Sequence, residues 1–215
     1  MPTLFSMDST LMRGLTRFAD VMILNLVFIA TALPVVTLGA ALTALNFTAM
    51  RIANGECNSV TGDYFRSFRS NFRQATIVAL LLALFAAVLG AWYVVITNID
   101  IPPLAEFGLL VVWYVLAYAL GTTTLFAFPY LAMFEGSTRA ILRNARLLSL
   151  KHPLTALGAM VLAALPIALT LLAPQATGYG MAWVAFGFAG IAVLQGHLFA
   201  RLFRTYIAAS AADQS

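Results

Sequence analysis

The sequence predicts an all-α protein of the polytopic membrane class, a helical bundle that crosses a lipid bilayer several times. Hydrophobic residues make up 62% of its 215 residues and charged residues only 9%, whereas soluble domains are about half apolar and about a quarter charged. Several apolar runs are also long enough to cross a bilayer. No alternating apolar and polar pattern of the kind found in membrane β-barrels accompanies them. A water-soluble surface cannot be built from this composition.

Four runs without any charged residue are predicted to be spanning helices. About 20 residues, at ~1.5 Å each, cross the ~30 Å hydrocarbon core of a bilayer. Lipid offers no hydrogen-bond partner to the backbone, so a helix is expected and an open strand is not. The four spans are residues 75–97, 107–134, 153–174 and 180–200.

The apolar stretch at residues 19–50 needs a break. As one straight helix it would reach about 48 Å, well beyond the hydrocarbon core. Pro34 lacks an amide donor and disfavours helix at Leu33, and Thr37 is suited to cap a new helix. We therefore expect a kinked or re-entrant helix pair broken at Pro34, preceded by an N-terminal interfacial segment at residues 1–18.

The placement of charge predicts the orientation in the membrane. Arginine and lysine gather in two loops, 51–74 and 135–152, and again after the last span. The connectors 98–106 and 175–179 contain no basic residue. Because basic loops stay on the cytoplasmic side, we expect an inner (plasma) membrane protein whose basic loops and C-terminal tail, residues 205–215, are cytoplasmic.

The N-terminus is expected on the same side, because Arg13 and Arg17 follow the same rule. The helix pair then enters and leaves on the cytoplasmic side, which gives six crossings, or four crossings and a re-entrant pair. The alternative is one kinked and tilted span with Arg13 and Arg17 outside, which gives five crossings.

Two short basic amphipathic helices are predicted at the membrane interface. One follows Asp63, a candidate cap, and carries phenylalanine and arginine in two separate stripes; the other follows Ser137. Such helices place aromatic rings at the acyl boundary and arginines on anionic headgroups. Docking to a cytoplasmic protein is the alternative. The candidate contact residues are Arg66, Arg69, Arg73, Arg139, Arg143 and Arg146.

No motif for catalysis or metal binding is present, so we expect no enzyme and no cofactor, metal or nucleic-acid site. The spans contain no Asp, Glu, Lys or Arg in their interiors, and ionisable residues within a membrane usually mark ion-coupled transport. Cys57 is the only cysteine, and neither His152 nor His197 has a second ligand at metal-binding spacing. The uncharged polar residues of the apolar segments are expected to hydrogen-bond between helices; they are Asn25, Asn46, Thr122, Thr123, Thr124 and Gln195.

Several stretches resemble the bacterial YesL family of integral membrane proteins: LFSMDSTLMRGLTRFADVMILNLVFIATALPVVTLGAALTAL, DYFRSFRSNFRQA, FPYLAMFE and NARLLSLKHP. The similarity runs from about Leu4 to about Tyr206, as a single membrane domain. Thr10 stands where family members often have proline. The family has no known biochemical activity, so the resemblance implies no site residues. Its members tend to be encoded beside sugar ABC uptake systems and glycoside hydrolases.

The resemblance implies an accessory role in carbohydrate uptake or utilisation, with a sugar ABC transporter as the candidate partner. The oligomeric state is left open. A second hypothesis, a facilitator for a neutral solute, comes from the uncharged polar positions within the apolar segments, such as Asn25 and Asn46.

The cytoplasmic position of the N-terminus is testable by labelling. A cysteine introduced at Thr3 should stay unlabelled when intact cells are treated with a membrane-impermeant maleimide, and should become labelled after the cells are opened. Labelling from outside would contradict the hairpin and support five crossings.

Overall fold

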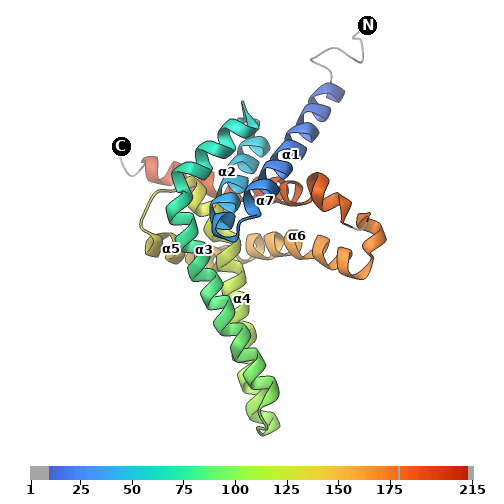
Figure 1. Ribbon diagram of the computed structural model, residues 1–215. Coiled ribbons are helices and arrows are strands. Elements are labelled where there is room, and N and C mark those ends of the chain that lie inside the picture. The colour runs from blue at the N-terminus through green and yellow to red at the C-terminus, as the bar shows by residue number, and fades with distance from the viewer. Residues whose placement is uncertain (1–9, 179, 213–215) are drawn as a thin grey trace.

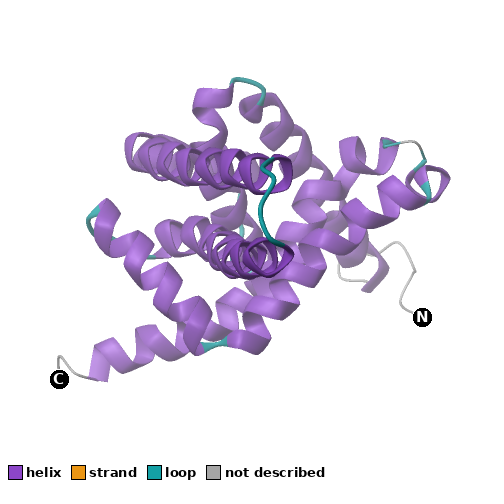
Figure 2. Cartoon of the chain, turned by 90° about the horizontal axis from the view of Figure 1, so that it is seen from below, coloured by secondary structure: helices purple, strands orange, loops and turns teal. Residues whose placement is uncertain are grey.

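The computed structural model describes residues 10–178 and 180–212, and within these ranges it contains helices and loops but no strand (Figure 2). The predicted all-α helical bundle is therefore confirmed. The α-helices in this part of the chain are α1 (Thr10–Ala32), α2 (Leu38–Asn54), α3 (Val60–Asn98), α4 (Pro103–Met133), α5 (Thr138–Lys151), α6 (Pro153–Leu172) and α7 (Phe188–Ala212).

Six helical segments of the described chain are long and apolar enough to cross a membrane. They are Gly14–Ala32, Val35–Asn54, Val60–Asn98, Pro103–Met133, Pro153–Leu172 and Trp183–Tyr206. Each of the four spans predicted from the sequence overlaps one of them, although the ends differ, and the other two are the N-terminal helices. This pattern indicates a multi-pass membrane protein.

The break at Pro34 separates α1 from α2. Pro34 is extended, with φ −75° and ψ 122°, and a short 3₁₀ turn (Val35–Thr37) follows it. Thr37 occupies the N-cap position of α2, but its hydroxyl does not cap that helix; it donates to the carbonyls of Thr31 at 2.5 Å and Pro34 at 2.6 Å. The chain then turns back, and α2 packs along α1 (Figure 1). The two helices form a hairpin and not one kinked span.

Helix α2 lies at the centre of the bundle and packs against α1, α3, α4 and α7. Its buried face consists mainly of small residues. A Cβ atom added at Gly39 would meet the carbonyl oxygen of Ala75 and come within 2.7 Å of the Cβ of Ala79. A Cβ added at Gly196 of α7 would lie 3.2 Å from the carbonyl oxygen of Ala49. The backbone of α3 thus approaches α2 at a position where only glycine fits, and the contact of α7 with α2 at Gly196 is tight but less extreme.

The far halves of α3 and α4 form a two-helix arm, defined here as residues 83–98 and 103–118. The arm projects away from the other helices (Figure 1), and most of its side chains are exposed. Its helices contact each other through Trp113, whose Nε1 donates to the carbonyl of Leu89 at 2.8 Å. An exposed apolar surface of this extent is expected of a helix pair surrounded by lipid.

The basic stretch of residues 51–74 is not the separate loop and interfacial helix expected from the sequence. Helix α2 runs to Asn54, and α3 begins at Val60 and continues without interruption into the span. No glycine or proline stands between residues 63 and 89 to end the helix. The amphipathic segment is therefore the first four turns of α3.

The other predicted segments agree with the observed helices in part. The basic helix expected within residues 135–152 is α5, a separate helix capped by Ser137, whose hydroxyl accepts from the amide of Ala140. The interfacial segment 1–18 belongs to α1 from Thr10 onward, and residues 1–9, which include Thr3, lie outside the described residues. The C-terminal tail continues α7 to Ala212, beyond which the description ends.

The packing at Gly39 leads to a stability prediction. Gly39→Ala should lower the midpoint of thermal denaturation of the purified protein in detergent, because the added methyl group collides with the backbone of α3. Overpacking of this kind costs about 1–3 kcal/mol. Gly90→Ala is the matched control, since a Cβ there meets nothing within 4 Å. Equal midpoints for the two variants would contradict the close contact between α2 and α3.

Candidate functional site

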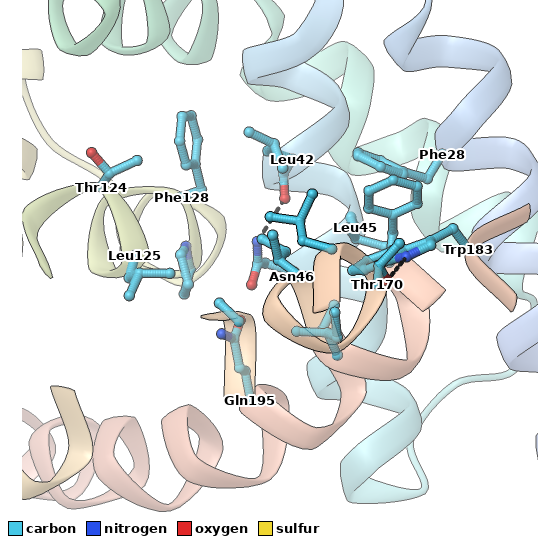
Figure 3. Close-up of a pocket in the computed structure, with 17 residues that line it drawn as sticks. Phe28, Leu42, Leu45, Asn46, Thr124, Leu125, Phe128, Thr170, Trp183 and Gln195 are labelled. Carbon is cyan, nitrogen blue, oxygen red and sulfur yellow. Dashed lines mark hydrogen bonds between the residues drawn. The ribbon is translucent and has the colours of Figure 1, made fainter. Parts of the chain in front are cut away.

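An open pocket of about 470 Å³ lies between α1, α2, α4, α6 and α7 (Figure 3). We call it the bundle pocket. Its size is within the range of about 300–1,000 Å³ that is usual for small-molecule sites. The walls are mainly apolar and include Phe28, Leu45 and Phe128. Its polar side chains come from four helical segments and are Asn46, Thr124, Thr170, Trp183 and Gln195.

The polar groups of the bundle pocket already donate hydrogen bonds within the protein. Asn46 Nδ2 donates to the carbonyl of Leu42 at 2.8 Å, and Trp183 Nε1 donates to Thr170 Oγ1 at 2.8 Å (Figure 3). Gln195 Nε2 donates to the carbonyl of Ala159 at 2.8 Å. The amide oxygens of Asn46 and Gln195 retain the capacity to accept. The pocket therefore suits a largely apolar molecule with one or two donor groups.

Asn25 lies outside this pocket and joins α1 to the start of the last span. Its side chain is fully buried. Nδ2 donates to the carbonyls of Trp183 and Val184, both at 2.8 Å, and Oδ1 accepts from the amide of Ala189 at 3.0 Å. Those carbonyls belong to a π-helical segment (Trp183–Gly187), where the wider turn disturbs the regular hydrogen bonds. The expected bonding of Asn25 between helices is confirmed.

The expectation of bonds between helices is wrong for four of the other polar residues. The hydroxyls of Thr122, Thr123 and Thr124 donate to carbonyls of α4 itself, one turn earlier. Asn46 likewise donates within its own helix. A threonine hydroxyl reaches the carbonyl three or four residues before it without any help from a neighbouring helix. Gln195, in contrast, joins α7 to α6.

Asp63 is not the cap of α3. Ser59 is the cap, and its Oγ accepts from the amide of Gly62 at 3.2 Å. Asp63 is instead 3% exposed, and its Oδ2 lies 2.8 Å from Arg51 Nε of α2. Arg66 Nη2 approaches its Oδ1 at 3.7 Å. The ion pair between Asp63 and Arg51 fastens the ends of α2 and α3 together. Sequence analysis missed it, although an acidic residue three positions before Arg66 was the available signal.

The six candidate arginines are all exposed, but the structure does not bring them into one site. Arg66 lines a hollow of about 420 Å³ that also contains Glu135 and Gln74. The α5 arginines, at 139, 143 and 146, line a separate and larger groove against α3 and α4. The two arginine-rich segments have similar sequences, but tertiary packing places their arginines in different surroundings.

The histidines make ordinary structural contacts. His152 Nε2 lies 2.9 Å from the hydroxyl of Tyr206, and His197 Nδ1 lies 2.9 Å from the carbonyl of Val193. Within residues 10–178 and 180–212, no three His, Cys, Asp or Glu side chains come together as a metal ion would require.

Residues 21–94 match a family model described as "Protein of unknown function, DUF624". The matched segment, about a third of the chain, is therefore similar to that family. The match runs from α1 through the central helix α2 to near the end of α3, and it is consistent with the resemblance to the YesL family. Neither a curated protein nor a solved structure matches the chain. The DUF624 family brings no activity and no site residues.

Cys57 lies within the DUF624 segment, in the loop between α2 and α3, and is half-buried. Burial of the thiol, together with the negative charge of Asp63, raises the pKa of Cys57 to about 11. The thiol is therefore almost entirely protonated at neutral pH. Since the thiolate is the reactive form, Cys57 should react slowly with electrophiles.

The reactivity of Cys57 can be measured directly. Because its pKa is raised from 9.0 to about 11, we expect the folded protein to react with a maleimide at pH 8 about a hundredfold more slowly than a thiol of ordinary pKa. The rate should climb until the pH reaches the raised pKa. The same protein denatured in detergent and urea is the control. Equal rates in the folded and denatured protein would refute the raised pKa.

Proposed function

We propose that this protein is a non-enzymatic accessory protein of carbohydrate uptake, which binds another integral membrane protein through its arm. The observation that carries the proposal is the arm itself. Its two helices contact each other and leave large apolar side chains exposed along their length, among them Leu84, Val94 and Phe107. A helix pair of this kind has free faces on which a second membrane protein can pack.

The α3 side of the arm carries small residues that no other described part of the chain covers. Ala83, Ala86, Ala87, Gly90 and Ala91 are all exposed, and a Cβ at Gly90 would meet nothing within 4 Å. In lipid, helices associate mainly through close van der Waals packing, and small residues permit it. The same type of surface is buried around α2, where it joins helices of this chain. On the arm it supports a contact with a partner helix.

The carbohydrate part of the proposal rests on the resemblance to the YesL family, whose members tend to be encoded beside sugar ABC uptake systems. The structure adds a physical reason for an accessory role. The bundle pocket has apolar walls and few free polar groups, whereas a sugar has many hydroxyl groups that lose hydrogen bonds when they leave water. We infer that a sugar ABC transporter carries the solute and that this chain assists it, with its basic segments in the cytoplasm.

A facilitator for a neutral solute is the second candidate. The amide oxygens of Asn46 and Gln195 in the bundle pocket favour it, because they can accept from a solute hydroxyl or amide. The small number of such groups ranks this function below the accessory role.

Co-purification tests the accessory role. In mild detergent, the tagged wild-type protein should recover subunits of a sugar transporter, and deletion of its gene should reduce uptake of that sugar. Gly90→Leu should lower the recovery several-fold, because the larger side chain projects from the free face of the arm. Gly14→Leu is the matched control, since a Cβ at Gly14 of α1 also meets nothing within 4 Å.

Two outcomes would overturn the accessory role. One is the recovery of no transporter subunit together with unchanged sugar uptake after deletion. The other is sugar uptake by proteoliposomes that contain this protein alone, provided that Gln195→Leu abolishes the uptake; that result would establish the facilitator.

A further inference from the structure

A groove of about 760 Å³ runs between α3, α4 and α5. We call it the arginine groove. Its first wall is α3 from Leu81 to Trp92, its second wall is α4 from Leu116 to Thr123, and α5 closes one end. The arginines of α5 are the charged side chains in this lining: Arg139, Arg143 and Arg146.

Polar and apolar groups are separated along the length of the groove. The loop before α5 is tied to α3 because Gln74 Nε2 donates to the carbonyl of Gly136 at 2.6 Å. Ile141 of α5 is buried in the same core as Ala75 and Val78. Helix α5 therefore lies beside the stretch of α3 that precedes Leu81. The arginines stand at this end of the groove, and the wall beyond them is apolar.

The apolar wall has the depth of one leaflet of a bilayer. From Leu81 to Trp92, α3 rises about 16 Å, at ~1.5 Å per residue. That is about half of the ~30 Å hydrocarbon core. A molecule whose charged end is at the arginines would have space for a chain as long as the acyl region of one leaflet.

The three arginines carry charge that the described part of the chain does not neutralise. They recur at i, i+4 and i+7 on one face of α5, while Ile141, Ala145 and Leu148 on the opposite face are buried. No acidic residue lines the groove. The ion pairs within residues 10–178 and 180–212 use Arg51, Arg66 and Arg204, and none of the α5 arginines. Three neighbouring guanidinium groups in this position favour the binding of an anion in the groove.

We propose that the arginine groove binds one anionic phospholipid, with its phosphate among the α5 arginines and an acyl chain along the walls of α3 and α4. Guanidinium groups bind phosphate oxygens through paired, charge-assisted hydrogen bonds. The acyl chain fills an apolar surface that a free phosphate ion would leave empty. A zwitterionic phospholipid fills the same surface but has no net negative charge to offset three arginines.

The other basic face gives the internal comparison. Arg66 already approaches the buried Asp63, and its hollow contains the carboxylate of Glu135. The hollow beside Arg66 has less apolar surface than the arginine groove, and it already contains a negative charge. The α3 arginines therefore lack the combination that distinguishes the groove on α5, although both helices carry three arginines at similar spacing.

Native mass spectrometry of the purified full-length protein tests the proposal. The probes are phosphatidylglycerol and phosphatidylcholine with the same acyl chains, added to the protein in detergent. We expect the wild type to bind phosphatidylglycerol at least tenfold more tightly than phosphatidylcholine. The triple variant Arg139→Gln, Arg143→Gln, Arg146→Gln should lose this preference. The triple variant Arg66→Gln, Arg69→Gln, Arg73→Gln removes the same charge and should keep it.

A groove-filling variant separates a lipid site from a simple anion site. Ala119 lies on the wall of the groove, and Ala119→Phe should weaken phosphatidylglycerol binding several-fold while leaving all three arginines in place. Inorganic phosphate at millimolar concentration should not displace the lipid. If the α5 triple variant does not fold, as judged by circular dichroism, Arg143→Gln and Ala119→Phe decide the question.

Four results would overturn the proposal. These are equal binding of the two lipids, equal loss of preference in both triple variants, unchanged binding by Ala119→Phe, and displacement of the lipid by inorganic phosphate. The last result would show that the groove holds a free anion. None of these results depends on whether a transporter partner is found.

Discussion

The close approach of neighbouring backbones to α2 is the constraint on which the rest of the structure depends. Within lipid, the hydrophobic effect does not hold helices together, so packing distance decides which helices associate. Gly39 brings α3 against α2, and Gly196 brings α7 against it. Helix α2 has 17 residues and α3 has 39. Because α3 is much longer than the helix that anchors it, its far half must leave the bundle, and the arm is the consequence.

Buried polar groups then fix the ends of the helices that packing has brought together. The pair between Arg51 and Asp63 holds the turn from α2 to α3, and Asn25 satisfies carbonyls in the π-helical segment that precedes α7. Each of these groups is occupied by a partner inside the chain. The α5 arginines are different, since they face a groove and have no acidic partner among the described residues. Unused charge beside an apolar wall is what distinguishes a binding surface from a structural contact.

The sequence predicted those features that depend on local properties. Apolar length located the spans, Pro34 located the break between α1 and α2, and Ser137 located the start of α5. Features that depend on distant residues were not predictable in this way. Asp63 resembles a helix cap until Arg51 is placed beside it, and Thr122 resembles a bridging residue until its own helix supplies the acceptor. The two arginine helices have similar patterns, and only the tertiary packing separates their surroundings.

The uninterrupted course of α3 couples the two ends of the molecule mechanically. At ~1.5 Å per residue its 39 residues extend about 58 Å, nearly twice the thickness of the hydrocarbon core. Without glycine or proline between residues 63 and 89, the helix is continuous, although it changes direction between its first turns and the arm (Figure 1). A bilayer that becomes thinner or thicker changes the tilt of its helices. The same helix that faces lipid in the arm also carries Asp63, whose partner Arg51 belongs to α2, so we expect a change in the tilt of the arm to load the turn that contains Cys57.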